Sequence, residues 1–120
     1  MTWRWVQSTG QLSRDGRIEG NGYSGAGDGK NNPEMQDVRN VGPIPRGTYT
    51  IGDPCDTESH GPYVLDLQPA EGNEMCGRSA FLIHGDSVSK PGTASKGCII
   101  LPRKVREAIW QSGDRQLEVV

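Results

Sequence analysis

The chain has 120 residues, which is enough for one hydrophobic core, and we treat residues 1–120 as a single domain. Its 17 glycines and 8 prolines, with only 32% hydrophobic residues, exclude a long-helix protein, a coiled coil and a collagen, and they favour short strands joined by tight turns. A net charge of −2 without a basic tail gives no support for nucleic-acid binding.

No segment of the chain is typical of a membrane span or a secretory signal. No stretch approaches the roughly 18 apolar residues of a transmembrane helix. Residues 1–7 lack the apolar centre of a signal peptide. We therefore expect the protein to stay in the cytoplasm, to leave by a route without a cleavable signal, or to be a piece of a longer chain.

Strand patterns dominate the N-terminal half. Residues 2–7 alternate large apolar and polar side chains, and Asp15-Gly16 is a strong hairpin signal, so we predict a two- or three-stranded meander over residues 2–24. Residues 20–33 are almost all turn formers and predict a long loop, which is either a floppy connector or an ordered loop near a site. Alternation predicts a further strand over residues 48–51.

Apolar or alternating runs in the C-terminal half predict strands over residues 63–67, 80–84, 98–101 and 115–120. One helix is predicted between the last two, with Pro102 at its first position and Gly113 just past its end. Its apolar face would comprise Leu101, Val105, Ala108 and Ile109, and the charged side chains of Arg103, Lys104, Arg106 and Glu107 would face solvent. The fold class is thus mainly β, with one helix over about 102–112.

Three cysteines, Cys55, Cys76 and Cys98, fit either one disulfide with one free thiol or three free thiols. Without a C-x-x-C pair, and with only 2 histidines, the chain is expected to bind no metal, and we expect no cofactor. Cys55 and Cys76 flank the strand predicted at 63–67. A disulfide between them would close a loop of about 20 residues, would stabilise the fold by about 3 kcal/mol, and would form in an oxidising compartment.

His84 and Cys98 are the candidate catalytic pair. A buried strand ends at His84, a polar loop follows, and Cys98 then begins the next apolar segment. Two neighbouring strands would hold both groups on rigid elements at one sheet edge, where the imidazole would favour the thiolate. Taken singly, such a cysteine or histidine is more often structural, but the two together, with this loop between them, favour catalysis.

Small and hydroxyl residues next to the pair have candidate supporting roles. Gly97 would let a substrate carbonyl approach the backbone N–H of Cys98, which would contribute to an oxyanion hole. The Ser95 hydroxyl would hold the imidazole or the substrate. Gly85 would allow a turn that keeps the His84 ring open to the cleft.

His84-Gly85 followed by Ser95-Lys96-Gly97-Cys98 resembles the H-G…[ST]-x-G-C signature of the L,D-transpeptidase (YkuD-like) family, and residues 43–51 are similar to its T-P-x-G-x-[FY]-x-I segment. The closer resemblance is to the compact branch of L,D-transpeptidase-like effectors of type VI secretion. That pattern adds Gly22-Tyr23-Ser24-Gly25, Asn31-Asn32-Pro33, Gly42-Pro43-Ile44-Pro45 and a Phe-x-Ile-His-Gly-Asp run. The resemblance covers roughly residues 9–110 and implies a small β-sandwich or barrel.

The resemblance also implies a mechanism. Cys98 would attack the carbonyl of the bond between meso-diaminopimelate and the terminal D-alanine of a peptidoglycan tetrapeptide stem, and His84 would activate Cys98 and protonate the leaving amine. Water, a free D-amino acid or another stem would then resolve the acyl-enzyme. The effector branch is associated with the first two outcomes.

The same resemblance implies substrate contacts at Tyr23, Gly85 and Lys96, although Lys96 stands where the larger family usually has His or Arg. Arg103 is either the arginine that the family often has after its cysteine or the first solvent-facing residue of the helix. His60 lies in a turn-rich segment, so a solvated loop residue is the favoured interpretation, and a cleft-lining residue is the alternative.

The leading hypothesis is an antibacterial toxin that is made in the bacterial cytoplasm, exported by a secretion machine, and active in the target-cell periplasm. Its expected partners are peptidoglycan stem peptides, a cognate periplasmic immunity protein that plugs the cleft, and the secretion machine or an adaptor protein. A second hypothesis is a housekeeping L,D-transpeptidase that forms cross-links. A third is a non-enzymatic β-module of a secretion or phage particle, with Cys98 in the core.

Overall fold

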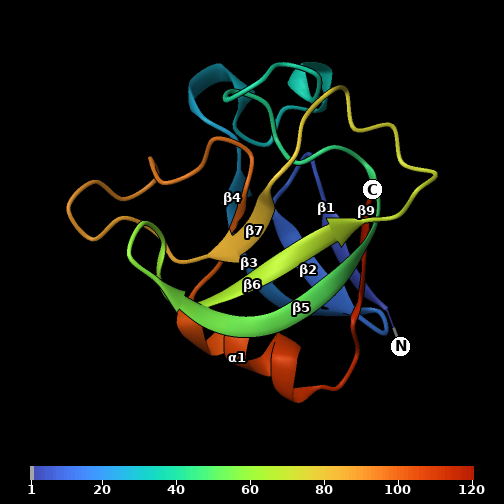
Figure 1. Ribbon diagram of the computed structural model, residues 1–120, viewed down its shortest axis with the longest axis vertical. Helices are drawn as coiled ribbons and strands as arrows, with labels where there is room; N and C mark the ends of the chain where they lie inside the picture. Colours follow the sequence, from blue (N-terminus) through green and yellow to red (C-terminus); the bar gives the residue numbers. More distant parts are fainter. Residues whose placement is uncertain (1) are drawn as a thin grey trace.

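The computed structural model describes residues 2–120, which form nine strands, one α-helix and two short 3-10 helices. The strands are β1 (Trp3–Val6), β2 (Gln11–Arg14), β3 (Arg17–Asn21), β4 (Tyr23–Ser24), β5 (Gly47–Thr57), β6 (Gly61–Pro69), β7 (Phe81–His84), β8 (Ile99–Ile100) and β9 (Gln116–Val119). The helices are η1 (Gly27–Gly29), η2 (Pro33–Met35) and α1 (Arg103–Gln111). The predicted mainly β class with one helix is confirmed (Figure 1).

The N-terminal meander is confirmed. Strands β1, β2 and β3 pair antiparallel in sequence order. The turn between β2 and β3 is Asp15-Gly16, and both residues have positive φ (56° and 77°), as a type I′ hairpin turn requires.

All nine strands belong to one sheet with the order β3-β2-β1-β9-β5-β6-β7-β8-β4. The two edge strands, β3 and β4, are consecutive in the chain and only Gly22 separates them, so the sheet curls until its edges meet. Gly22 donates its backbone N–H to Gly10 O at 2.8 Å on the β2 side. On the other side it lies so close to Ile100 O that a Cβ would overlap this oxygen. A small barrel results.

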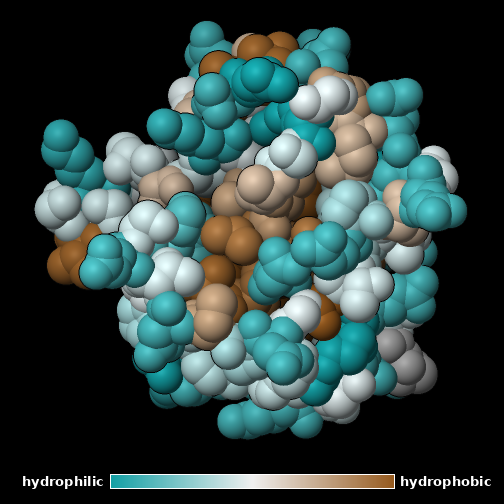
Figure 2. Space-filling view, viewed as in Figure 1, coloured by the Kyte–Doolittle hydropathy of each residue, from teal (hydrophilic) through white to brown (hydrophobic). Residues whose placement is uncertain are grey.

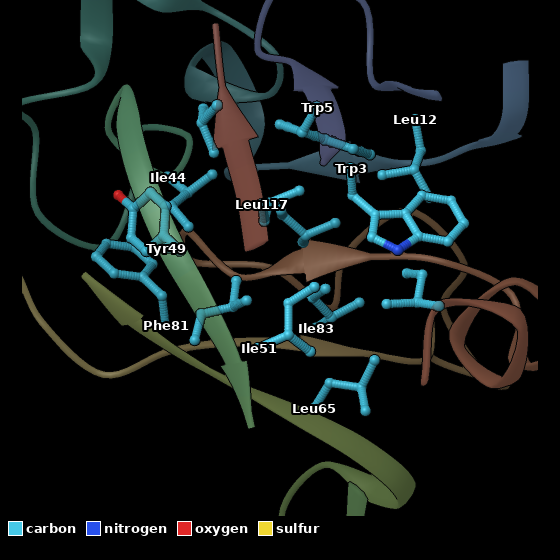
Figure 3. Close-up of a cluster of buried hydrophobic side chains, with 14 of the residues drawn as sticks. Trp3, Trp5, Leu12, Ile44, Tyr49, Ile51, Leu65, Phe81, Ile83 and Leu117 are labelled. Atoms are coloured by element: carbon cyan, nitrogen blue, oxygen red, sulfur yellow. The ribbon is translucent and has the colours of Figure 1, made fainter. Parts of the chain in front are cut away.

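The core fills this barrel. Trp3 and Trp5 alternate with the exposed Arg4 and are fully enclosed, as the alternation predicted. Inward residues of the other strands meet them, namely Leu12, Tyr49, Ile51, Leu65, Ile83 and Leu117, with Ile44 and Phe81 beside Tyr49 (Figure 3). Burial of each such side chain contributes about 2 kcal/mol, so this core supplies most of the drive to fold.

Two predictions about the helix are corrected. Arg106 is buried, with 4% of its surface exposed, whereas Ala108 is exposed. The helix packs on the barrel through Ile109 and through Arg106 one turn earlier, because the Arg106 guanidinium enters a cavity beside Gly85. Pro102 is the N-cap and does not occupy the first helical position.

No helix within residues 2–120 has the length and apolar character needed to cross a bilayer.

The strand and loop boundaries also differ from prediction. Strand β5 continues to Thr57, well past the expected end at 51, and passes Pro54 at a shift of register with β6, where a proline is tolerated. The long loop after β4 is ordered. It contains η1 and η2, and Asn31 Oδ1 accepts a hydrogen bond from Ser24 N at 3.0 Å.

Candidate active site

The parallel pairing of β7 with β8 brings His84 and Cys98 together. His84 ends β7 and lies opposite Ile100, while Cys98 directly precedes β8 and Ile99 lies opposite Ile83. In this register Cys98 lies opposite Leu82, just before β8 begins, whereas His84 stands two positions further along at the end of β7. Both side chains line one cavity of about 720 Å³.

The imidazole of His84 is buried and held in one tautomer. Its Nδ1 lies 2.9 Å from Gly85 O, and since a carbonyl only accepts, Nδ1 carries the proton. Nε2 is then the basic nitrogen. Burial lowers the pKa of His84 below its ordinary value, and the electrostatic influence of His60 and Arg106 lowers it further, so the ring is neutral at pH 7 and can accept a proton.

Burial raises the pKa of the Cys98 thiol, while the backbone N–H of Leu82 and the guanidinium of Arg78 oppose that rise. A raised thiol pKa beside a lowered imidazole pKa means that the resting pair is neutral. If Cys98 acts as a nucleophile, its proton would have to move to His84, in a general-base step.

His60 lies against His84. Its ring centroid is 4.7 Å from that of His84, with the planes tilted by 50°, and its Nδ1 lies 2.9 Å from Ser59 Oγ. The turn between β5 and β6 carries His60 beside the loop that follows His84 (Figure 1). His60 is thus a half-buried turn residue that lines the cavity, as the cleft-lining alternative predicted. The cause is the length of β5 and β6, which the sequence did not reveal.

A second hollow adjoins the first at the nucleophile. It measures about 470 Å³, is lined by Arg39, Arg78 and Phe81, and shares His60, Lys96 and Cys98 with the 720 Å³ cavity. On the face shown in Figure 2, hydrophobic residues are visible in a hollow over β6 and β7, with hydrophilic residues around it. Cys98 therefore has space for bound groups on two sides.

The model of the Tlde1 domain matches residues 19–120 of the chain. The chain belongs to the Tlde1 domain family. This family comprises L,D-transpeptidase-like effectors of type VI secretion, and it is associated with peptidoglycan modification. Among curated proteins there is no match to the chain. The effector family predicted from the motifs is therefore confirmed, over a range that begins later and ends later than predicted.

In this Tlde1 domain the loop from Gly85 to Gly97 is braced by Tyr23. The Tyr23 hydroxyl donates to Asp86 Oδ1 at 2.5 Å and accepts from Ala94 N at 2.9 Å. Burial and the Asp86 carboxylate raise the pKa of Tyr23 to about 12. Tyr23 lines a separate cavity of about 670 Å³ and not the one that contains Cys98, so its position fits a brace of the loop better than a substrate contact.

Ser95 and Gly97 shape the backbone at the nucleophile. Ser95 Oγ donates to Cys98 O at 2.6 Å and accepts from Gly25 N and Gly97 N, so its hydroxyl holds the chain and not the imidazole. Gly97 has φ +142°, and a Cβ there would lie 2.5 Å from Arg78 Nη2 and 2.8 Å from Phe81 Cε1. The glycine is therefore required by packing, whereas the predicted reason was the approach of a substrate carbonyl.

Arg78 belongs to this site, although no sequence motif pointed to it. Its side chain is buried and donates to Gln36 O (2.7 Å), Pro43 O (2.8 Å), Gly42 O (2.9 Å) and Lys96 O (3.1 Å). One guanidinium thus ties the segment 36–43 to the segment that carries Cys98. No local pattern marks Arg78, since it stands in a polar turn like an exposed arginine.

Arg103 and Lys96 occupy different positions relative to the nucleophile. Arg103 is exposed on α1, donates from Nε to Glu107 Oε2 at 3.3 Å, and lies over the Tyr63 ring. It lines the 670 Å³ cavity without Cys98, which favours the solvent-facing interpretation. Lys96 lines both hollows at Cys98, as a substrate contact would.

The predicted disulfide between Cys55 and Cys76 does not form in this structure, where both residues are free thiols. The Tyr49 hydroxyl reaches the sulfur of Met75 at 3.4 Å, which places the turn of Cys76 beside Tyr49. Cys55 lies six residues further along β5, roughly 20 Å away at the rise of a strand. A disulfide requires Cα atoms within about 7 Å of each other.

Proposed function

We propose that this Tlde1 domain is a cysteine enzyme that cleaves the bond between diaminopimelate and the terminal D-alanine of peptidoglycan tetrapeptide stems, or exchanges that D-alanine for another D-amino acid. The observation that carries the proposal is the juxtaposition of Cys98 with a neutral His84 in one cavity, with Nδ1 tied to a carbonyl and Nε2 left as the base. A non-enzymatic module would have no need for this arrangement.

The proposed reaction begins when His84 Nε2 takes the proton from the Cys98 thiol. The sulfur attacks the carbonyl carbon of the scissile amide, and the tetrahedral intermediate collapses as His84 gives its proton to the nitrogen of the leaving D-alanine. A thioester remains on Cys98. Water then attacks the thioester with His84 as base, or a free D-amino acid attacks through its amine, which completes hydrolysis or exchange.

The backbone at Cys98 limits how the oxyanion is bound. The Gly97 N–H already donates to Ser95 Oγ at 3.0 Å. In our proposal the Cys98 N–H supplies the donor, and Ser95 positions it by fixing the Cys98 carbonyl. Ser95 is then a positioning residue.

The proposal extends to place and partners. As an effector domain of type VI secretion, the chain would be delivered into competing bacteria and act on their periplasmic peptidoglycan. A cognate immunity protein would protect the producer by occupying the cavity at Cys98, and the secretion machine or an adaptor would bind elsewhere on the surface.

Purified tetrapeptide muropeptides, digested by the protein and analysed by mass, test the proposal. We expect shortened stems and free D-alanine from the wild type, and no product from Cys98→Ala, with Cys55→Ala as the matched control because that thiol is exposed on β5. Full activity of Cys98→Ala would refute the mechanism. New dimers in place of shortened stems would identify the housekeeping cross-linking activity.

A further inference from the structure

Arg106 is a buried cation with no anion paired to it among residues 2–120. Only 4% of its surface is exposed, its Nη1 donates to Leu101 O at 3.3 Å, and its Nε has no hydrogen-bond partner within residues 2–120. The nearby carboxylates are engaged elsewhere. Asp86 accepts from Tyr23 and from the backbone of Gly92, and Glu107 accepts from Arg103.

In the absence of a ligand, this position of Arg106 lowers the stability of the fold. A guanidinium has five N–H donors, and burying its Nε without a hydrogen-bond partner costs free energy that an apolar side chain on the same helix face would avoid. The desolvation of Arg106 and the charge of Arg103 lower its pKa, which reflects the same penalty. The cost is offset when an anion from outside the chain completes the site.

The guanidinium lies where a substrate would meet it. Arg106 lines the 720 Å³ cavity together with His84 and Cys98, and it also lines the neighbouring 670 Å³ cavity. A Cβ on Gly85 would lie 2.7 Å from Arg106 Nη1. Only a glycine therefore lets the guanidinium lie against the backbone next to His84, which is a different reason for this glycine from the open turn predicted above.

We propose that Arg106 binds the carboxylate of the terminal D-amino acid of the substrate. The proposal rests on the proposed function for the identity of the ligand. His84 protonates the leaving amine, so the leaving residue lies on the His84 side of Cys98, and its carboxylate is only two bonds from that amine. The fork of an arginine matches a carboxylate with two parallel hydrogen bonds. Arg106 would thereby restrict cleavage to the last residue of a stem.

An assay without peptidoglycan tests the anion site. Cys98 is alkylated with iodoacetate, which is an anion, and with neutral iodoacetamide, in a Cys55→Ala/Cys76→Ala background. We expect Arg106→Gln to lower the iodoacetate to iodoacetamide rate ratio about ten-fold or more, as for a charge-assisted hydrogen bond. Lys104→Gln removes the same charge from an exposed position on the same helix and should leave the ratio within two-fold. An unchanged ratio in Arg106→Gln would overturn the proposal.

A second assay tests the ligand. The wild type should cleave tetrapeptide stems with a free terminal carboxylate at least ten-fold better in kcat/KM than stems with a terminal amide, and Arg106→Gln should lose that preference. Equal cleavage of both stems by the wild type would overturn the assignment, even if Arg106→Gln fails to fold. Arg106→Lys keeps the positive charge without the forked guanidinium, and its preference for the free carboxylate should lie between those of the wild type and Arg106→Gln. If no stem is cleaved but the alkylation ratio depends on Arg106, the anion site stands and the proposed function fails.

Discussion

Replacing Arg78 by methionine should remove the guanidinium clamp behind Cys98 while keeping an unbranched apolar stem. The bonds to Pro43 O and Gly42 O are buried and those to Gln36 O and Lys96 O are partly buried. Each buried carbonyl that loses its donor lowers the free energy of unfolding by about 1–3 kcal/mol, and a carbonyl that water can reach lowers it by less. We expect the free energy of unfolding to fall by about 4 kcal/mol, a large share of the total for a domain of this size.

Urea denaturation measures this loss. With a slope of about 2 kcal/mol per molar urea, the midpoint should fall by about 2 M, whereas Arg17→Met, at an exposed position of β3, should leave it unchanged. Since the positive charge of Arg78 lowers the pKa of Cys98, the alkylation profile of Cys98 should also move to higher pH in Arg78→Met and much less in Arg78→Lys. A loss of stability below 1 kcal/mol would refute the reasoning.

Three further predictions concern the site. In pH–rate profiles, the acid limb of kcat/KM should lie below the ordinary histidine pKa of about 6.5, because burial lowers the pKa of His84. In His60→Ala the acid limb should move up toward about 6.5, because the influence of His60 on the pKa of His84 is removed. Gly97→Ala should destabilise the fold by about 2 kcal/mol or more in urea denaturation, because its Cβ meets packed atoms, while Gly16→Ala meets none and should cost about 1 kcal/mol. Tyr23→Phe should cost about 1 kcal/mol and speed amide exchange at Ala94, with unchanged exchange as the contrary result.

Local sequence patterns were sufficient to predict the elements that depend on contacts between neighbouring residues. The alternation around Trp3 and Trp5, the Asp15-Gly16 turn and the helix ending before Gly113 each depend on neighbours in the sequence, and the structure has all of them. The proximity of His84 and Cys98 was also predictable. Two short apolar strands joined by a single loop are expected to be neighbours in the sheet, and β7 and β8 are paired.

What the sequence left hidden depends on contacts between distant segments. A charged residue at the boundary of the apolar face of a helix is predicted to face solvent. For Arg106 this prediction is wrong, because its side chain is buried against the barrel. The reasons for Gly85 and Gly97 lie in guanidinium groups that arrive from α1 and from the turn before β7. Likewise, His60 reaches His84 only because β5 and β6 extend far enough to carry their turn over the cavity.

The buried Arg78 and Arg106 act on opposite members of the Cys98–His84 pair. Arg78 favours the Cys98 thiolate, whereas Arg106 disfavours the His84 imidazolium, so before substrate arrives the proton stays on sulfur. A substrate carboxylate on Arg106 neutralises the charge that opposes the imidazolium and leaves the effect of Arg78 in place. Proton transfer from Cys98 to His84 then becomes easier when the terminal residue is bound. In the proposed mechanism substrate binding and thiol activation are coupled in this way, and the substrate-free protein would present a less reactive thiol to other electrophiles.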